Sequence, residues 1–346
     1  MVALTLRLDL WSVAEVDQAS SCMPDTVTEG VEMTNPNTTV TLTDAAAARP
    51  PVRRRGKIAG MLQRHESLRG FFLLSPTLVV MTIGIVIPFA ILVTMSLWTA
   101  VGFDFNTTLT TQNYQTAIEQ PIYGALMHRS LVISGWATVG TVLLSYPMAY
   151  YVAFHVHKNK MMWIVLMTLP FWTSYLLRVF AWKVVLGYEG VINSGLLWAG
   201  LIEAPLEFLL YSQQAVVITL AHSWVAFAIL PIYVSLEKID RSLLEAATDL
   251  GDGPVARFFR ITLPLSLPGV IAASFLIFIP TTGDYITPAL LGGPDGMMIG
   301  NLIQLQFGPV NNWPMGATLA IGLMLYIAAI GLVFLALTKV FRERMA

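Results

Sequence analysis

The stretch that decides the fold is EAATDLGDGPVARFFRITLP, residues 245–264. It places charged residues, glycines and prolines between two long apolar segments. Ser242, three residues before Glu245, predicts a capping box that starts a helix, and Gly251 can adopt positive φ and end it. A polar stretch with such ordered spacing indicates a docking surface for a partner that this sequence does not contain.

A second interpretation of this stretch rests on its apolar residues, which recur at helical spacing. They are Leu243, Leu244, Ala247 and Leu250. A helix with such a face can lie in the membrane interface without binding any protein. After the turn at Gly253 and Pro254, residues 255–260 are predicted to form a second short helix. Pro264 and Pro268 suit the first turn of the span that follows, where a missing N–H costs little.

The composition argues against a soluble enzyme. The chain is 55% hydrophobic and 12% charged, whereas soluble domains carry about 25% charged residues. A net charge of -1 gives no reason to expect a nucleic-acid partner. The single cysteine, Cys22, excludes an internal disulfide framework and a thiolate metal cluster. The sequence contains no phosphate-binding loop or His-Glu-x-x-His motif, so we expect no cofactor or metal on this chain and any ATP on another subunit.

Six apolar segments, each about as long as the ~20-residue helix that crosses a bilayer, predict an all-α membrane protein with six transmembrane helices. They cover about 70–98, 130–154, 161–186, 215–236, 267–291 and 315–340. With six spans, the basic residues of 53–69, 158–160, 238–260 and 339–344 all fall on one side of the membrane. The positive-inside rule makes that side the cytoplasm. We therefore expect both termini and the loop at about 240–264 to be cytoplasmic.

The first 60 residues differ from the six-span domain, residues 61–346. They are rich in Thr, Asn, Asp, Ala and Pro and hold too little apolar surface to offset the entropy of ordering. Residues 1–60 are therefore predicted to be a disordered cytoplasmic tail. Met33 is a second candidate for the true start, which would remove residues 1–32; N-terminal sequencing that found them in the mature protein would exclude this.

The opening stretch is similar to the cytoplasmic signature of the inner-membrane permease subunits of bacterial ABC importers. That signature reads Glu-Ala-Ala, three residues, Gly, nine residues, Ile, one residue, Leu-Pro. Every fixed position is present here: Glu245, Ala246, Ala247, Gly251, Ile261, Leu263 and Pro264. The resemblance implies a type I ABC importer permease fold. The loop would form a coupling helix in a groove of a separate ATPase, with Glu245 pairing with polar groups, Ala246 and Ala247 in close contact, and Gly251 at a bend.

From about residue 70 to 346 the chain also resembles permeases of the spermidine/putrescine type, and their first permease subunit more than their second. The likeness includes Leu169–Tyr175, Gly283-Asp284-Tyr285 and Met298–Ile303. It implies a location in the bacterial inner membrane, a second, different permease subunit, two ATPase subunits that bind ATP and magnesium, and a periplasmic binding protein that delivers a polyamine. Related permeases carry other small solutes, so an opine, an amino-acid-like compound or another organic cation stays open.

A carboxylate in the fifth segment offers one indication of the substrate. Pro280 and Gly283 are predicted to break the helix near Thr281, and broken helices at such depth line cavities. An intramembrane carboxylate is a functional candidate, and aromatic faces add cation–π contacts to a bound amine. The candidate substrate path comprises Asp284, Tyr285, Trp172, Tyr175, Thr281 and Thr282. The alternative is an ion pair of Asp284 with Arg178 or Lys183 that only joins two spans.

Two other classes of membrane protein compete with the permease interpretation. A stand-alone secondary transporter often contains two similar halves, but spans one to three show no convincing likeness to spans four to six. A membrane enzyme needs a catalytic pair or metal ligands, and the sequence shows neither.

His222, in the fourth segment, is predicted to be a packed histidine bonded to a neighbouring Ser or Thr rather than a proton relay.

Overall fold

The structure is a computed structural model that describes residues 66–345 except 103. The predicted tail at 1–60 and the candidate start at Met33 lie outside the described residues. The chain divides into two units, Met1–Leu73 and Leu74–Ala346, and the packing described below belongs to the second.

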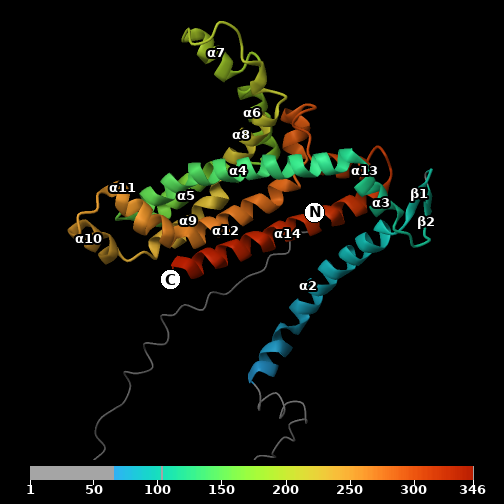
Figure 1. The fold of residues 1–346 in the computed structure, drawn as a ribbon, viewed down its shortest axis with the longest axis horizontal. Coiled ribbons are helices and arrows are strands. Elements are labelled where there is room, and N and C mark those ends of the chain that lie inside the picture. The colour runs from blue at the N-terminus through green and yellow to red at the C-terminus, as the bar shows by residue number, and fades with distance from the viewer. Residues whose placement is uncertain (1–65, 103, 346) are drawn as a thin grey trace, which may run out of the picture. The chain divides into compact units, whose positions relative to one another are not determined.

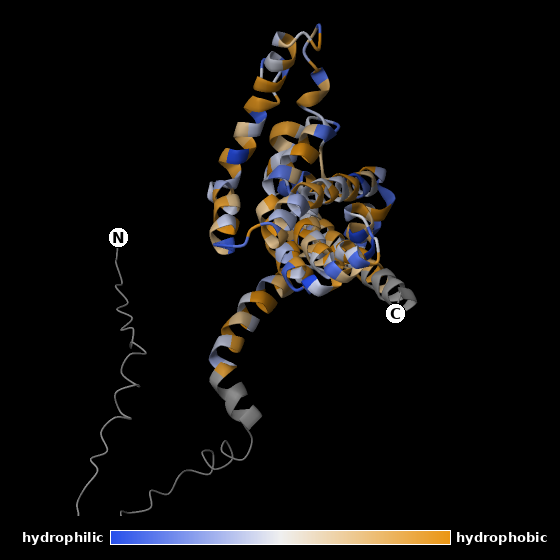
Figure 2. Ribbon diagram, turned by 90° about the vertical axis from the view of Figure 1, so that its left-hand side faces the viewer, coloured by the Kyte–Doolittle hydropathy of each residue, from blue (hydrophilic) through white to orange (hydrophobic). Residues whose placement is uncertain are grey.

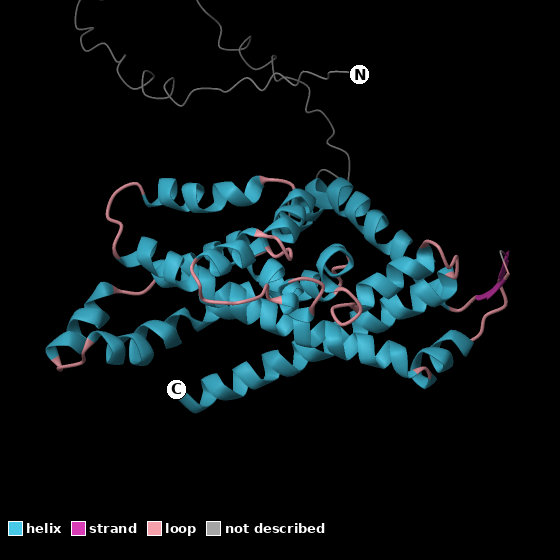
Figure 3. Ribbon diagram, turned by 90° about the horizontal axis from the view of Figure 1, so that it is seen from above, coloured by secondary structure: helices cyan, strands magenta, loops and turns pink. Residues whose placement is uncertain are grey.

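Helices make up most of the described chain (Figures 1 and 3). The long ones are α2 (Glu66–Ser96), α4 (Pro121–Phe154), α12 (Leu263–Thr282) and α14 (Trp313–Met345). The shorter ones are α3 (Gln112–Glu119), α5 (Lys160–Thr168), α6 (Tyr175–Val185), α7 (Val191–Trp198), α8 (Gln213–Ser223), α9 (Val225–Glu237), α10 (Arg241–Asp249), α11 (Pro254–Arg257) and α13 (Ile299–Phe307). Short 3₁₀ or π turns are η2 (Leu169–Trp172), η3 (Glu207–Leu209), η4 (Phe258–Thr262) and η5 (Pro288–Gly292).

One small feature departs from the all-α prediction. β1 (Thr99–Val101) and β2 (Asp104–Asn106) form an antiparallel hairpin in which Ala100 lies opposite Phe105. The hairpin follows α2, and Asn113 of α3 supports its start by donating to the carbonyls of Ser96 and Trp98 at 3.0 and 2.6 Å. The fold class is otherwise as predicted.

Four stretches of the described chain are helices long and apolar enough to cross a membrane, and two further candidates are bent pairs. The pair α5–η2 and α6 is bent by 77° and the pair α8 and α9 by 51°. The predicted six spans are reached if each pair counts as one span. The segments predicted as the third and fourth spans are therefore pairs of helices with a sharp bend between them, which membrane proteins accommodate where other groups satisfy the freed backbone.

The helices at two predicted spans have other bounds than those spans. The helix at the second, α4, begins at Pro121 rather than near 130, because proline at the first helical position needs no N–H partner. The helix at the fifth is one run from Pro254 to Thr282, so it starts before and ends earlier than the predicted 267–291. It ends where Gly283 breaks the helix, as the proline and glycine in that segment predicted.

The core lies where α4, α9 and α12 pack together. Its buried side chains include Ala149, Ala228, Ile232, Ala273 and Ile277, and the small alanines among them let membrane helices approach closely. Gly269 of α12 marks the closest crossing, because a Cβ there would overlap the Pro231 carbonyl and the Ser235 side chain of α9. The Gly269 N–H donates to Ser235 Oγ at 3.2 Å.

The apolar part of α2, Leu74–Ser96, has a mean hydropathy of 2.6, and none of its most apolar window is buried within the chain. Apolar residues recur along this helix (Figure 2). A surface of that kind needs lipid or another subunit to cover it.

Candidate functional site

The loop that contains Glu245 begins with α10, and Asp240 caps that helix. Asp240 Oδ1 accepts a hydrogen bond from the Ser242 N–H at 3.0 Å. This backbone bond, and then the bond with the Ser242 side chain, lowers the pKa of the exposed Asp240 carboxyl, since both favour its charged form. The predicted capping box of Ser242 and Glu245 is therefore wrong: an acceptor two residues earlier already binds a free N–H of the first turn.

Gly251 ends α10 as predicted, with φ +89°. Its N–H donates to the Thr248 carbonyl at 2.9 Å, and the Asp252 N–H donates to the Ala247 carbonyl at 2.9 Å. These two bonds form a Schellman motif, which requires a left-handed residue where only glycine is free of strain. The chain reverses here and leads into α11.

The segment after α10 is not the separate short helix predicted for residues 255–260. α11 continues through the π turn η4 into α12. The Leu263 N–H donates to the Phe258 carbonyl across this turn, and the wider turn lets the helix continue into Pro264, which has no N–H to contribute. Ile261, Leu263 and Pro264 are half-buried at this junction.

Two arginines join α10 and the turn after it to the start of this helical run. Arg257 Nη1 donates to Thr248 Oγ1 at 2.6 Å. Arg260 Nη1 lies 2.7 Å from Asp252 Oδ1. Both pairs join the loop to the α11–η4–α12 run, so α10 is attached to that run by side chains as well as by the backbone.

The three residues of the Glu-Ala-Ala motif face different ways. Glu245 and Ala246 are exposed, whereas Ala247 is 5% exposed and faces the rest of the chain. Leu243 and Leu250, three residues before and four after Ala246, are exposed large apolar residues on the same side of α10 as Ala246. The loop thus presents an exposed apolar surface around Ala246, and the Glu245 carboxylate is exposed on another side of the helix.

A groove of about 700 Å³ lies beside α10, between α9 and α12. Its lining includes Leu230, Val234, Lys238, Leu243, Leu265 and Ala272.

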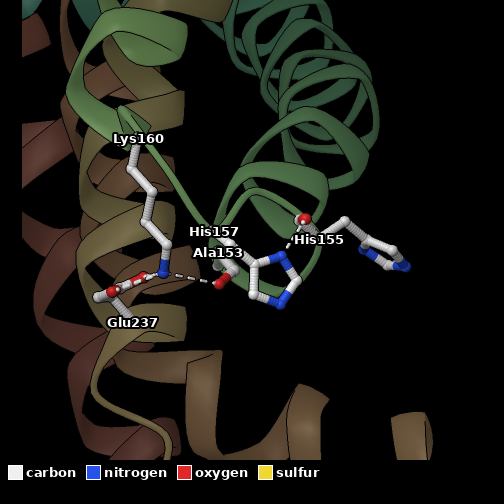
Figure 4. Close-up of polar contacts among 5 residues, drawn as sticks. All are labelled: Ala153, His155, His157, Lys160 and Glu237. Carbon is white, nitrogen blue, oxygen red and sulfur yellow. Dashed lines mark hydrogen bonds and ion pairs between the residues drawn. The ribbon is translucent and has the colours of Figure 1, made fainter.

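Nearby, Lys160 Nζ lies 2.8 Å from Glu237 Oε1 and donates to the Ala153 carbonyl at 3.0 Å (Figure 4). One lysine thereby joins the start of α5 to the ends of α4 and α9.

The carboxylate of Asp284 lies in the loop that follows α12. Tyr175 Oη, at the start of α6, donates to Asp284 Oδ2 at 2.5 Å. Asp284 Oδ1 accepts from the Ile286 N–H at 2.9 Å, and Tyr175 Oη also lies 2.6 Å from Thr287 Oγ1. The structure therefore brings Asp284 and Tyr175 together, as predicted, and adds Thr287, which is fully buried.

The other residues predicted for the substrate path do not join this cluster. Trp172 and Tyr285 are 75% and 46% exposed. Thr281 and Thr282 are buried, and their hydroxyls donate back to carbonyls of α12, to Ile277 at 2.8 Å and to Phe278 at 2.7 Å. These hydroxyls stabilise the end of the helix.

The alternative ion pair of Asp284 with Arg178 or Lys183 is wrong. Within the described residues the ion pairs are Lys160 with Glu237 and Arg260 with Asp252. Lys183 lies 5.8 Å from the centre of the Tyr211 ring. Arg178 donates to backbone carbonyls instead, and Asp284 is held by a hydroxyl and an N–H.

Arg178 donates hydrogen bonds to backbone carbonyls at the bends of two helix pairs. Its Nη2 donates to the carbonyls of Phe171 and Thr173, at 2.5 and 3.0 Å, where η2 ends. Its Nη1 donates to the Ser223 carbonyl at 2.8 Å, where α8 ends. That carbonyl has lost its helical partner, since the Phe227 N–H donates to Trp224 at 3.1 Å.

Sequence reasoning missed this role of Arg178 and missed Thr287 and Asn301. Asn301 Nδ2 donates to the Tyr285 carbonyl at 2.8 Å and so fixes the loop after α12. The spacing of Tyr175 and Arg178, three residues apart on one helix, was the available signal. His222 is packed, as predicted, but its Nδ1 accepts from Trp182 Nε1 at 3.1 Å and not from a Ser or Thr.

Across residues 66–345 apart from 103, no group of three or more His, Cys, Asp or Glu side chains could hold a metal ion.

Comparison with known proteins gives a consistent result. The model of the family described as "Binding-protein-dependent transport system inner membrane component" matches residues 58–346. The spermidine/putrescine transport system permease protein PotB of Haemophilus influenzae is 36% identical over 75% of this chain and 91% of that protein. The inner membrane ABC transporter permease protein YdcU of Escherichia coli is 33% identical over 79% of this chain and 91% of that protein.

Among solved structures, a chain of a bacterial alginate ABC transporter, in complex with a periplasmic protein that carries an alginate pentasaccharide, shares the fold. It has a TM-score of 0.61 and 17% identity over 79% of this chain and 94% of that chain.

Proposed function

The chain belongs to the family of binding-protein-dependent transport system inner membrane components, and we propose that it is a permease subunit of an ATP-driven importer of polyamines. It would form half of the translocation path. The other half would come from a second, different permease subunit, with two ATPase subunits on the cytoplasmic side and a binding protein on the periplasmic side. The relatives named for spermidine and putrescine transport support the substrate class.

The observation that carries this proposal is the loop built around α10. It presents the exposed Glu245 and Ala246 beside exposed apolar residues, and two arginines brace it against α11 and η4. A helix that a partner pushes needs both an exposed contact surface and a stiff attachment to a span. In this arrangement Glu245 and Ala246 touch the ATPase, and Ala247 seats α10 on its own chain.

The candidate cation site supports the substrate class. Asp284 is half-buried and forms no ion pair with another described residue. A carboxylate at membrane depth is costly unless it is paired, and Tyr175 with the Ile286 N–H supplies hydrogen bonds but no charge. A protonated amine of the substrate would supply the missing positive charge, so we propose Asp284 as a substrate contact.

Orientation follows from the basic residues. The α10 loop and both chain ends lie in the cytoplasm in this proposal, and Asp284 lies toward the periplasmic end of α12. The exposed apolar face of α2 is covered by lipid or by the second permease subunit.

Uptake by the reconstituted complex tests the proposal. The chain, a second permease subunit and the ATPase are placed in proteoliposomes, with binding protein and radiolabelled spermidine outside and ATP inside. Uptake that needs every component supports the subunit assignment. Uptake by this chain alone, driven by an ion gradient, would refute it.

Docking of the ATPase is tested at Glu245. Glu245→Lys is expected to keep membrane insertion but to lose co-purification of the ATPase and uptake, because a cation replaces the exposed carboxylate at the contact. Glu203→Lys, a change of the same charge at an exposed residue between α7 and η3, is the matched control and should behave as wild type. Normal co-purification with Glu245→Lys would contradict the role given to α10.

A further inference from the structure

One face of α6 carries three polar side chains. Tyr175, Arg178 and Trp182 are spaced so that they lie on the same side of the helix. Each hydrogen-bonds a place where another helix ends: Tyr175 the loop after α12, Arg178 the Ser223 carbonyl, and Trp182 the ring of His222. The bent third span is thus attached to both the fourth and the fifth by this polar face.

Tyr175 has two neighbours but only one hydrogen to donate. An ionised Asp284 can only accept, so the Tyr175 hydrogen goes to Asp284 and the Thr287 hydroxyl donates to the Tyr175 oxygen. The reverse arrangement is equally open to these groups: Tyr175 can donate to Thr287 when Asp284 has another partner. Tyr175 therefore has a second hydrogen-bond partner ready, which is buried at the same place.

We propose that Tyr175 is a latch that the substrate opens. The Tyr175 hydroxyl occupies the carboxylate oxygen that a substrate ammonium would bind. When the ammonium binds Asp284, Tyr175 turns its hydrogen to Thr287, and α6 loses its bond to the Asp284 carboxylate. The inference rests on the proposed function, because it takes Asp284 as the contact of the cationic substrate.

The consequence of opening the latch is local to one end of α6. The contacts of Arg178 with Ser223 and of Trp182 with His222 do not use Asp284, so they keep α6 on the fourth span. The loop after α12 is then held to Tyr175 by the Thr287 hydroxyl alone, because Thr287 lies in the same loop as Asp284. Because Pro254–Thr282 is one helical run, the loss of one of these two bonds loosens the end of the run opposite α10. Substrate binding would thereby ease the movement that the ATPase drives.

The test measures ATP hydrolysis by the complete complex, reconstituted in nanodiscs, with empty and with spermidine-loaded binding protein. Tyr175→Phe removes the hydroxyl alone. It is expected to raise hydrolysis without substrate by about tenfold or more, because it removes the hydrogen bond to the charged Asp284, worth about tenfold, together with the bond to Thr287, and so to reduce the stimulation by substrate. Tyr188→Phe, an exposed tyrosine after α6, is the control and should match wild type.

Asp284→Asn gives the opposite result if the latch exists. The asparagine oxygen still accepts from Tyr175 but attracts no ammonium, so hydrolysis should cease to respond to spermidine. Thr287→Val removes the second partner of Tyr175 and should raise the spermidine concentration for half-maximal stimulation roughly fivefold. It also checks the latch if Tyr175→Phe fails to assemble.

The outcomes separate the two proposals. If Asp284→Asn abolishes uptake while Tyr175→Phe and Thr287→Val respond to spermidine as wild type does, the latch is refuted and the cation site stands. If Asp284→Asn takes up spermidine normally, the cation site is refuted, and the latch with it.

Discussion

Replacing Arg178 with methionine should destabilise the protein by about 2–4 kcal/mol. Methionine keeps an unbranched side chain but removes every donor. The carbonyls of Ser223, a residue 2% exposed, and of Phe171, half-buried, then lose their partners. Each buried carbonyl without a donor costs about 1–3 kcal/mol. The carbonyl of the exposed Thr173 adds little to the loss of stability, because water can replace its donor. The removal of the partly buried Arg178 charge offsets part of the loss.

The assay for Arg178→Met is thermal denaturation of the purified complex, followed by fluorescence. A fall of roughly 5 °C or more is expected. Lys183→Met is the control on the same helix: it removes a cation 5.8 Å from the Tyr211 ring, a contact worth about 0.5–1 kcal/mol. Equal denaturation temperatures for the two variants would refute the view that Arg178 holds both breaks together.

Two further changes test local features. Gly269→Ala should lower the denaturation temperature by forcing α9 and α12 apart, at a cost of about 1–3 kcal/mol; Gly195→Ala, where a Cβ meets nothing within 4 Å, is the control, and equal effects would contradict the close crossing. Asp240→Ala should speed hydrogen exchange of the Ser242 amide at neutral pH. Because the pKa of Asp240 is lowered in the folded state, its stabilisation is present above the unfolded value of about 4 and is lost as the pH falls through the lower folded pKa. The difference between wild type and variant should therefore shrink as the pH falls below about 4 and vanish below the folded pKa, and a difference that persisted there would exclude the charged cap.

The helical fold could be predicted from hydropathy, but the breaks in it only in part. Glycines in the sequence predicted the end of α12 at Gly283 and the end of α10 at Gly251. The bend at Trp224 was invisible, because both halves of that span are apolar and a hydropathy profile registers no change of direction. The π turn before Pro264 could not be predicted from the sequence either, because it is defined by the hydrogen bond of the Leu263 N–H to the carbonyl five residues earlier, at Phe258.

The candidate site was predictable in part. Asp284 stood out because its charge interrupts an apolar run, and Tyr175 was predicted beside it, but the choice between a hydroxyl and a cation as the partner of Asp284 could not be made from charge. Arg178 was the obvious candidate, but the carbonyls that it binds become free only where the third and fourth spans break. Thr287 gave no signal in the sequence, because a buried hydroxyl resembles any other threonine of a membrane span.

The α10 loop and Asp284 lie at opposite ends of one helical run. Pro254–Thr282 contains 29 residues, which at ~1.5 Å per residue extends about 40 Å. Arg257 joins α10 and Arg260 joins the turn after α10 to the first turns of this run, and the loop of Asp284 follows its last turn. The run continues through the π turn η4 and through its prolines. The wider π turn accommodates Pro264, the first proline of α12. In the mechanism that we propose, a force on α10 therefore reaches Asp284 through one continuous helix, and the Tyr175 hydroxyl holds the loop that follows the far end of that helix.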